Sequence, residues 1–189
     1  SPLSSASSSS RGRYDMGHLR TARDASTALG NSAKARQKLT AEQIMEVGAR
    51  LRSGKLNMIG LAICLYSMRV YSTQDAGIKA LLVVLTSKLQ ESKDLFGSQA
   101  VGNALYGLQN MSSDAKEVRG MLDVLREKVA GCREELKAQN VGNALYGLQN
   151  MSSDAKEVRG MLDMLTDKVA GCREELKAQN VGNALYGLQ

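Results

Sequence analysis

Residues 101–140 read VGNALYGLQNMSSDAKEVRGMLDVLREKVAGCREELKAQN, and residues 141–180 repeat this stretch. Only three positions differ: the second copy has Met164, Thr166 and Asp167 where the first has Val124, Arg126 and Glu127. A third copy begins at Val181 and reaches Gln189, the last residue of the sequence. Self-similarity at a fixed period of 40 residues predicts a stack of repeated units, each made of one supersecondary motif.

Each unit is predicted to form two amphipathic helices joined by a short turn. Between the helices, Asp114 and Glu117 have the spacing of a helix N-terminal cap, and Gly131 is typical of a helix end. One pair alone offers its apolar stripes too few partners, so we expect neighbouring units to bury them. The two runs at helical spacing are Val101, Ala104, Leu105, Leu108, Met111 and then Val118, Met121, Leu122, Leu125, Val129.

Three glycines, Gly102, Gly107 and Gly120, lie inside these helical patterns. A glycine in a helix interior costs about 1 kcal/mol relative to alanine. We therefore interpret all three as points where helices approach each other closely, and not as flexible positions.

A diverged copy of the unit precedes the two near-identical ones, because a shift of 40 residues aligns the apolar stripes without a gap. Before it, a capping box at Thr40 and Gln43 predicts a leading helix within residues 37–56 that ends near Gly54. Its apolar stripe is Ile44, Val47 and Leu51. The predicted fold is all-α, a solenoid of 40-residue helix-pair repeats. The repeat region spans residues 57–189, with units at 61–100, 101–140, 141–180 and, in part, 181–189.

Residues 1–36 are Ser-rich and basic and show no apolar periodicity, so we expect an extended or disordered tail. This composition is typical of an organelle transit peptide or its remnant, and an ordinary solvated tail is the alternative. Because residue 1 is not Met, we expect a fragment or a processed product. The basic residues assigned to the tail are Arg11, Arg13, Arg20, Arg23, Lys34 and Arg36, together with Lys38 just after it.

The residue types present argue against catalysis. The one histidine, His18, excludes His-based triads and most His-containing metal sites. Cys64, Cys132 and Cys172 are isolated and form no zinc pattern. No phosphate-binding glycine loop occurs, and no apolar run reaches the roughly 18 residues of a membrane span. We therefore expect a non-enzymatic protein with no metal, cofactor, small-molecule substrate or transmembrane segment.

A second stripe on the first helix of each unit carries candidate contact residues. Amide groups pair with base edges and tyrosines stack on bases, so one set per unit is suited to reading successive nucleotides. The alternative is structural, with the amides bonded to neighbouring backbone and the tyrosines packed between units. The candidates are Asn103, Tyr106, Asn110, Asn143, Tyr146 and Asn150.

The positive charge of the chain is concentrated outside the near-identical repeats. Residues 1–60 hold ten Lys and Arg against four Asp and Glu, whereas residues 101–140 hold six of each. Phosphate binding needs clustered Lys and Arg. A basic tail that contacts RNA or a membrane surface therefore fits the charge as well as RNA along the repeats does.

One ordered run leads into and through the first helix of the unit: Leu136, Gln139, Val141, Asn143, Leu145, Tyr146 and Leu148. With this run the helix resembles the octotricopeptide repeats and the related helical repeats found beside RAP domains in organellar RNA-binding proteins. Tyr146 stands where the family has Trp, and the Pro that precedes the family's Gln is absent. The resemblance implies an all-helical fold and RNA binding in mitochondria or chloroplasts, in transcript processing, translation or ribosome assembly.

Two functions remain open at this point. The first is RNA binding in an organelle, which the resemblance and the basic tail favour. The second is a structural adaptor subunit of a large organellar assembly, such as a ribosome, photosystem or respiratory complex, which the neutral repeats favour. The fourth unit ends after its first helix, so we expect Leu185 and Leu188 to form an exposed stack end that further repeats or a partner protein cover.

Overall fold

The computed structural model describes residues 19–189, and within this range the chain forms nine α-helices and one 3-10 turn, without a strand. The all-α prediction is confirmed for this part of the chain. Arg11 and Arg13 lie outside the described residues. The elements are α1 (Ala22–Lys34), α2 (Ala41–Ser53), α3 (Met58–Ser67), η1 (Met68–Val70), α4 (Ile78–Glu91), α5 (Ser98–Tyr106), α6 (Lys116–Gly131), α7 (Ala138–Tyr146), α8 (Lys156–Ala170) and α9 (Ala178–Gly187).

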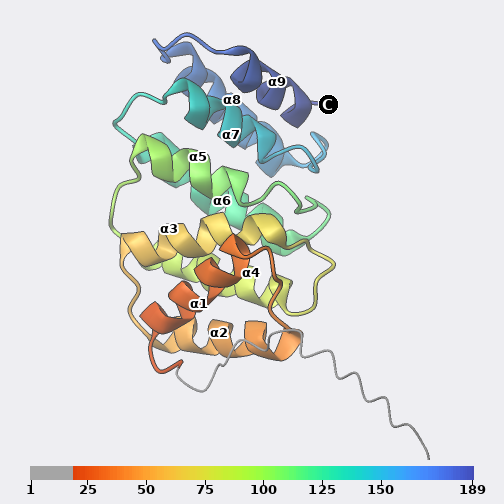
Figure 1. The fold of residues 1–189 in the computed structure, drawn as a ribbon. Coiled ribbons are helices and arrows are strands. Elements are labelled where there is room, and N and C mark those ends of the chain that lie inside the picture. The colour runs from red at the N-terminus through yellow and green to blue at the C-terminus, as the bar shows by residue number, and fades with distance from the viewer. Residues whose placement is uncertain (1–18) are drawn as a thin grey trace, which may run out of the picture.

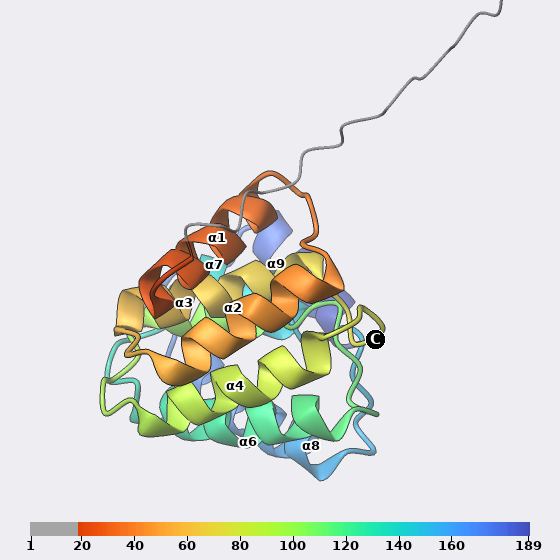
Figure 2. The same ribbon diagram turned by 90° about the horizontal axis from the view of Figure 1, so that it is seen from below.

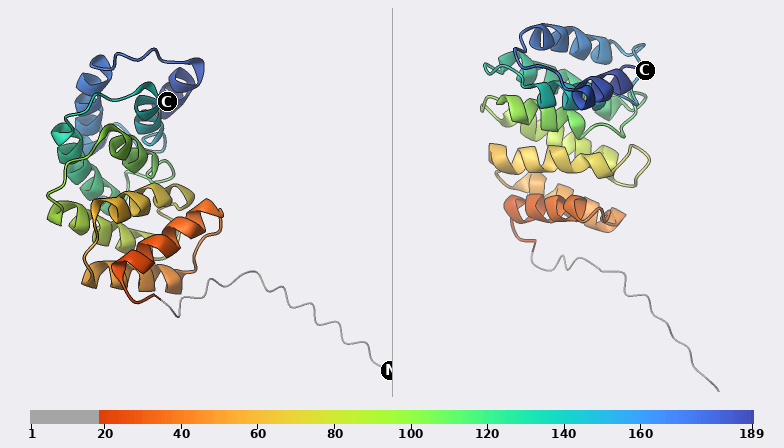
Figure 3. Two further views of the ribbon diagram at one scale, coloured as in Figure 1. Left: turned by 60° about the vertical axis from the view of Figure 1, so that its left-hand side comes forward. Right: turned by 45° about the horizontal axis from the view of Figure 1, so that its top comes forward.

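The helices form two layers. The odd-numbered helices α1, α3, α5, α7 and α9 pack side by side in what we call layer A, and α2, α4, α6 and α8 form layer B (Figures 1 and 2). Figure 3 shows the helix pairs succeeding one another from α1 and α2 at one end of the molecule to α9 at the other. The helices from α3 onward therefore pack mainly against their counterparts in the pairs before and after them, whereas α2 packs against both α1 and α4.

Burial of the apolar stripes between successive pairs builds one continuous core. All ten stripe residues predicted within residues 101–129 are buried, as are Ile44, Val47 and Leu51 of α2. A fully buried Leu, Ile or Val side chain stabilises a fold by about 1.5–3 kcal/mol. The predicted capping box of α2 is also confirmed, since Thr40 and Gln43 bond each other's backbone N–H groups and Gly54 is the C-cap.

The expectation of an extended segment at residues 1–36 is wrong for Ala22–Lys34, which form α1. Thr21 and Asp24 make a capping box that starts this helix. Its buried face consists mainly of small residues, which an apolar-periodicity search passes over but which allow close packing against α2 and α3. The buried residues of α1 are Ala22, Ala25, Ser26, Leu29, Ser32 and Ala33.

The predicted cap at Asp114 is also wrong, because α6 begins at Lys116 and has no side-chain cap. The turn is held instead by Arg119, whose guanidinium reaches back from α6 and donates to the carbonyl oxygens of Ser113 and Asp114 at 2.7 and 2.9 Å. Arg159 makes the same two bonds in the next pair. The turn before α6 is therefore stabilised by the guanidinium of Arg119, and not by the carboxylate of Asp114 as predicted.

The first helix of each unit is shorter and begins earlier than the apolar run suggests. It spans Ser98–Tyr106, three residues before the predicted unit boundary, and Leu108 and Met111 lie in the turn that follows. Short-range backbone bonds such as Leu108 N to Leu105 O keep these two residues buried although the α-helix has ended. The apolar stripe therefore continues beyond the end of the helix, so its periodicity does not show where the helix ends.

Backbone contact between neighbouring helices of layer A depends on glycine. A Cβ atom built on Gly107 would overlap the carbonyl oxygen of Leu65, and Gly147 stands in the same relation to Leu105. Gly102 also has the predicted close approach, to the backbone of Asn140. At Gly120 the prediction is wrong, since a Cβ there would meet no atom within 4 Å.

Alanine substitution at these glycines is expected to act in opposite directions. Gly107→Ala should lower the free energy of unfolding by about 3 kcal/mol. The added Cβ would overlap the backbone carbonyl of Leu65, which cannot move aside as a flexible side chain can. Gly120→Ala should raise it by about 0.5–1 kcal/mol through helix propensity. Urea unfolding followed by circular dichroism measures both, and equal effects at the two positions would refute the close approach of α3 and α5.

Candidate functional site

Four tyrosines form a ladder along layer A. Tyr66, Tyr106, Tyr146 and Tyr186 come from α3, α5, α7 and α9, with ring centroids 5.6–5.9 Å apart and planes inclined by 23–25°. Offset stacking at this separation contributes about 0.5–1.5 kcal/mol per pair beyond burial. The guanidinium of Arg69 lies 4.0 Å from the ring centroid of Tyr66, at the α3 end of the ladder.

The ladder restricts what Tyr106 and Tyr146 can bind. Each of these two rings stacks on a tyrosine of the preceding helix and on another of the following helix. A nucleobase could enter between them only by separating helices that glycine contacts hold together. Both rings are half-buried, so the parts left to a ligand are the ring edges and hydroxyl groups.

Asn103 and Asn143 lie on the half-buried surface of layer A and border pockets between neighbouring helices. Asn103 borders a pocket of about 480 Å³ between α3 and α5, which also contains Ile59, Ile63 and Tyr66. Asn143 borders a polar pocket of about 410 Å³ between α7 and α9. The two equivalent amides therefore have different surroundings: the pocket at Asn103 is mainly apolar, and the pocket at Asn143 is mainly polar.

Asn110 and Asn150 have structural contacts. The Asn110 side chain donates to the carbonyl oxygen of Arg69 at 2.6 Å, and the Asn150 side chain donates to that of Gln109 at 2.6 Å. Both bonds tie one helix pair to the turn of the preceding pair, 41 residues earlier. For Asn110 and Asn150 the structural alternative therefore applies: their amides bond the backbone of the preceding pair.

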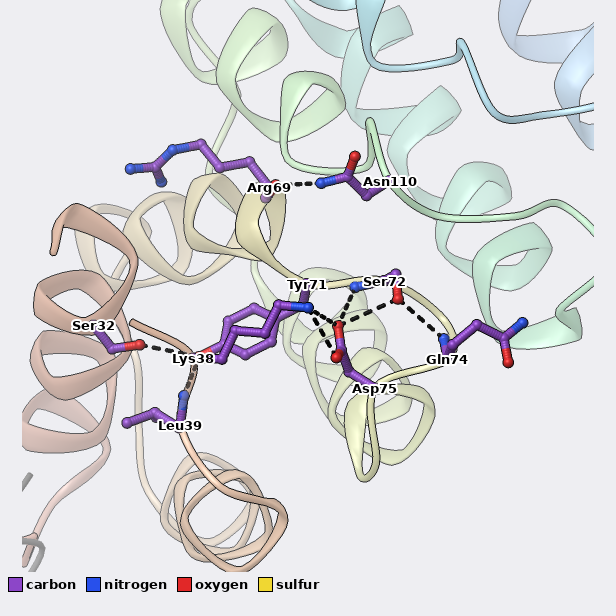
Figure 4. A network of polar contacts seen from close by, with 9 residues as sticks. All are labelled: Ser32, Lys38, Leu39, Arg69, Tyr71, Ser72, Gln74, Asp75 and Asn110. Atoms are coloured by element: carbon purple, nitrogen blue, oxygen red, sulfur yellow. Dashed lines mark hydrogen bonds and ion pairs between the residues drawn. The ribbon is translucent and has the colours of Figure 1, made fainter. Parts of the chain in front are cut away.

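Figure 4 shows how the first of these bonds adjoins a polar network at the turn after α3. The Tyr71 side chain is buried, and its hydroxyl accepts from Leu39 N at 3.1 Å and shares a 3.0 Å hydrogen bond with Ser32. Lys38 donates to both carboxylate oxygens of Asp75 at 2.8 and 2.9 Å. Partial burial acts to raise the pKa of Asp75, but bonds from Lys38 and Ser72 together hold the pKa below its usual value.

The other basic residues of the predicted tail differ in their placement. Lys38 is committed to Asp75, whereas Arg20, Arg23, Lys34 and Arg36 have exposed side chains on or beside α1. Arg36 has φ of +55°, the left-handed conformation that often follows a helix end. Of these four residues, Arg23 and Lys34 lie within α1, and Arg20 and Arg36 flank it.

Two charged residues of each later pair bond the backbone ends of the preceding pair. The Glu134 carboxylate accepts from Ser98 N at 2.7 Å at the start of α5, and Glu174 accepts from Ala138 N at 3.0 Å at the start of α7. Lys128 and Lys168 donate to the carbonyl oxygens of Ser92 and Cys132, beyond the ends of α4 and α6. Sequence reasoning missed these caps because their partners are backbone groups about 36 residues away.

The three cysteines are free thiols in different environments. Cys64 lies in the core between α1 and α3, where burial raises the pKa of its thiol to about 12 despite a hydrogen bond with Ser26. Cys132 is buried and Cys172 is half-buried. Within residues 19–189, no cluster of three or more His, Cys, Asp or Glu side chains could hold a metal ion.

Comparison with models of protein families, with curated proteins and with solved structures finds no match for this chain. Along residues 19–189, no helix combines the length and apolar character needed to cross a bilayer.

The bond from Glu134 to α5 is expected to make stability pH-dependent. The hydrogen bond from Ser98 holds the pKa of Glu134 below the ordinary value of 4.5. The stabilisation is therefore present above pH 4.5 and is lost as the pH falls through the lower folded-state value. Glu134→Gln should unfold more easily than wild type at pH 7, and the difference should shrink toward pH 3.

Urea titrations at pH 7, 5, 4 and 3 measure this difference. Glu127→Gln is the matched control, since Glu127 is exposed on α6. A gap between wild type and Glu134→Gln that stays constant from pH 7 to pH 3 would rule out a carboxylate cap.

Thiol reactivity should separate the cysteines. At pH 8 the Cys64 thiol is protonated and shielded, so it should react with a disulfide reagent on the order of 100-fold more slowly than Cys172. Mass spectrometry of the labelled folded protein measures the two rates, and labelling in denaturant provides the control. Similar rates in the folded chain would show that Cys64 is not enclosed.

Proposed function

We propose that this chain is a non-enzymatic helical-repeat protein, a solenoid of 40-residue helix pairs, that binds single-stranded RNA in a mitochondrion or chloroplast. Layer A is the proposed binding surface, and the resemblance to octotricopeptide repeats supports RNA as the ligand. The observation that carries the proposal is the recurrence of one amide and one tyrosine edge in α5, α7 and α9 along this layer.

The arrangement of Asn103 and Asn143 supports a polymer as the partner. Both amides lie at the same position of successive helices, each beside a pocket, and Tyr66 of the tyrosine ladder also lines the pocket at Asn103. Amides can bond the edges of unpaired bases, and tyrosine hydroxyl groups can bond sugar or phosphate. Base stacking between the rings has no part in the proposed mode, because the rings already stack on one another.

Electrostatic attraction is assigned to the basic N-terminal region and not to the repeats. Arg23 lines the pocket between α1 and α3 together with Lys55, and Arg20 is exposed just before the start of α1. Phosphate contacts here would raise affinity without sequence preference, and the amides of the later units would add base contacts.

A protein-binding adaptor is the second candidate, because layer A also carries an exposed apolar patch. Ile59 is 71% exposed and Ile63 is 39% exposed on α3, at positions that Gln99 and Asn103 occupy in α5. These two isoleucines line the pockets on both sides of α3. Such residues suit a partner protein of a large organellar assembly better than they suit RNA.

Fluorescence anisotropy with the 189-residue chain and a labelled single-stranded RNA tests the first candidate. Replacing Asn103 and Asn143 together by Ala should weaken binding about 10-fold, because two hydrogen bonds are removed, with the salt dependence unchanged. Gln90→Ala, on layer B, is the control. Replacing Arg20 and Arg23 by Ser should reduce the slope of log affinity against log salt concentration by about 0.7 for each phosphate that is no longer neutralised.

Absence of salt-dependent RNA binding by the intact chain would overturn the RNA proposal. Isolation of the native particle followed by nuclease digestion then tests the adaptor, which should remain bound after the RNA is removed.

A further inference from the structure

The exposed side of α3 carries apolar residues where its counterparts in layer A carry amides. Ile59 and Ile63 occupy the positions that Gln99 and Asn103 have in α5, and α7 and α9 also have Gln and Asn there. Both isoleucines are exposed, and we call them the apolar pair. Because α3 packs between α1 and α5, this exposure does not arise from an end of the stack.

A pocket lies on each side of α3, and the apolar pair lines both pockets. The pocket toward α1 has a volume of about 570 Å³, and the pocket toward α5 one of about 480 Å³. A Cβ built on Gly30 of α1 would lie 2.8 Å from the Ile63 side chain, so Ile63 packs closely against α1. The apolar pair is one helical turn long, which suits the apolar stripe of a docked helix.

The pocket toward α1 is positively charged. Arg23 and Lys55 line it, and its other lining residues are uncharged. Within residues 19–189, neither of these two cations forms an ion pair with a carboxylate. Both charges are therefore available to a negatively charged ligand.

The start of α3 adds to this positive potential. Its first turn contributes Ile59 and Gly60 to the same pocket. Negative groups are stabilised at a helix N-terminus, and α1 and α2 have Asp24 and Glu42 there. The first turn of α3 has no acidic residue, so an external carboxylate would meet an uncompensated helix end.

The pocket toward α5 has the opposite charge. Glu134 borders it, and its carboxylate accepts a hydrogen bond from Ser98 N at 2.7 Å. A ligand that covers the apolar pair therefore meets positive charge on the α1 side and negative charge on the α5 side. Its own negative groups would lie over α1.

We propose that the apolar pair docks an acidic amphipathic helix of a partner protein. The apolar stripe of that helix packs on Ile59 and Ile63 and fills the two pockets, and carboxylates along one edge of the stripe face Arg23 and Lys55. Charge complementarity identifies this occupant. The inference names the kind of partner that the adaptor candidate would take and rests on that candidate, and it does not depend on RNA binding.

Other occupants fit the apolar pair less well. Residues 1–18 of this chain contain Arg11 and Arg13 against one carboxylate, Asp15, so they would bring positive charge to a positive pocket. Single-stranded RNA carries the required negative charge, but its bases are recognised through hydrogen bonds and stacking. The aliphatic side chains of Ile59 and Ile63 offer neither.

Two labelled synthetic peptides test the proposal against the 189-residue chain by fluorescence anisotropy. The first repeats Leu-Ala-Glu-Leu-Leu-Glu-Ala, an amphipathic helical pattern with an acidic face. The second has Lys in place of every Glu and is the matched control. The acidic peptide should bind, and the Lys peptide should bind at least about 10-fold more weakly, because the cations beside α3 repel it.

The contribution of the apolar pair is measured with Ile59→Gln, which introduces the residue that α5 has at this position. It should weaken binding of the acidic peptide about 10-fold, because the burial of one large apolar side chain is lost. Met45→Gln is the matched control, since Met45 is similarly exposed but lies on α2 in layer B. Unchanged circular dichroism of both variants shows that they fold.

The contribution of charge is measured with Lys55→Glu. This variant should bind the acidic peptide about 5-fold more weakly and the Lys peptide more tightly, because the charge that faces the ligand is reversed. Lys79→Glu makes the same change on the exposed face of α4 in layer B and should leave both affinities unchanged.

Three results would overturn the proposal. The first is no binding of the acidic peptide, or equal binding of the two peptides. The second is equal weakening by Ile59→Gln and Met45→Gln. The third is tighter binding of the acidic peptide by Lys55→Glu than by wild type, which would point to a basic occupant such as residues 1–18.

Failure here is distinguishable from failure of the adaptor candidate. A subunit held in a particle through another surface would survive nuclease digestion and still bind neither peptide. The RNA-binding measurement contains no peptide, so its outcome is separate from both.

Discussion

Direct contact between the backbones of neighbouring helices in layer A is the constraint on which the rest of the structure depends. It needs Gly107, Gly147 and Gly187 at one position of successive helices, each against the carbonyl of a leucine 42 residues earlier. That approach sets the separation at which the tyrosine rings stack and at which Asn110 reaches the turn of the preceding pair. Apolar burial supplies most of the stabilisation, but glycine fixes the geometry in which it occurs.

Hydrogen bonds between successive helix pairs fix how the pairs are aligned with one another. Glu134 bonds the start of a layer A helix, and Lys128 bonds the backbone beyond the end of a layer B helix, both in the preceding pair. Each bond satisfies backbone groups that a helix end leaves open. These side chains serve the interface between pairs, whereas Asn103, Asn143 and the apolar Ile59 and Ile63 border pockets on the surface of layer A.

The fold follows from the sequence wherever side-chain periodicity carries the signal. The stripes of α4, α6 and α2 and the cap at Thr40 were all predictable from residue spacing. Helix α1 was not, because its buried face is mostly Ala and Ser and its burial depends on neighbours far along the chain. The cap predicted at Asp114 failed for a related reason: a local motif matched, but Arg119 reaches the same turn. At the site, sequence alone could not separate Asn103 from Asn110, since their roles differ only in the distance to another pair's backbone.

The tyrosine ladder has an optical consequence. The chain contains no tryptophan, so the excited tyrosine rings cannot transfer their energy to an indole. Rings less than 6 Å apart exchange excitation readily, and light absorbed by one of them migrates along the column before it is emitted. An event that parts two helices of layer A interrupts this migration between their rings, so phenol emission reports the separation without an added dye.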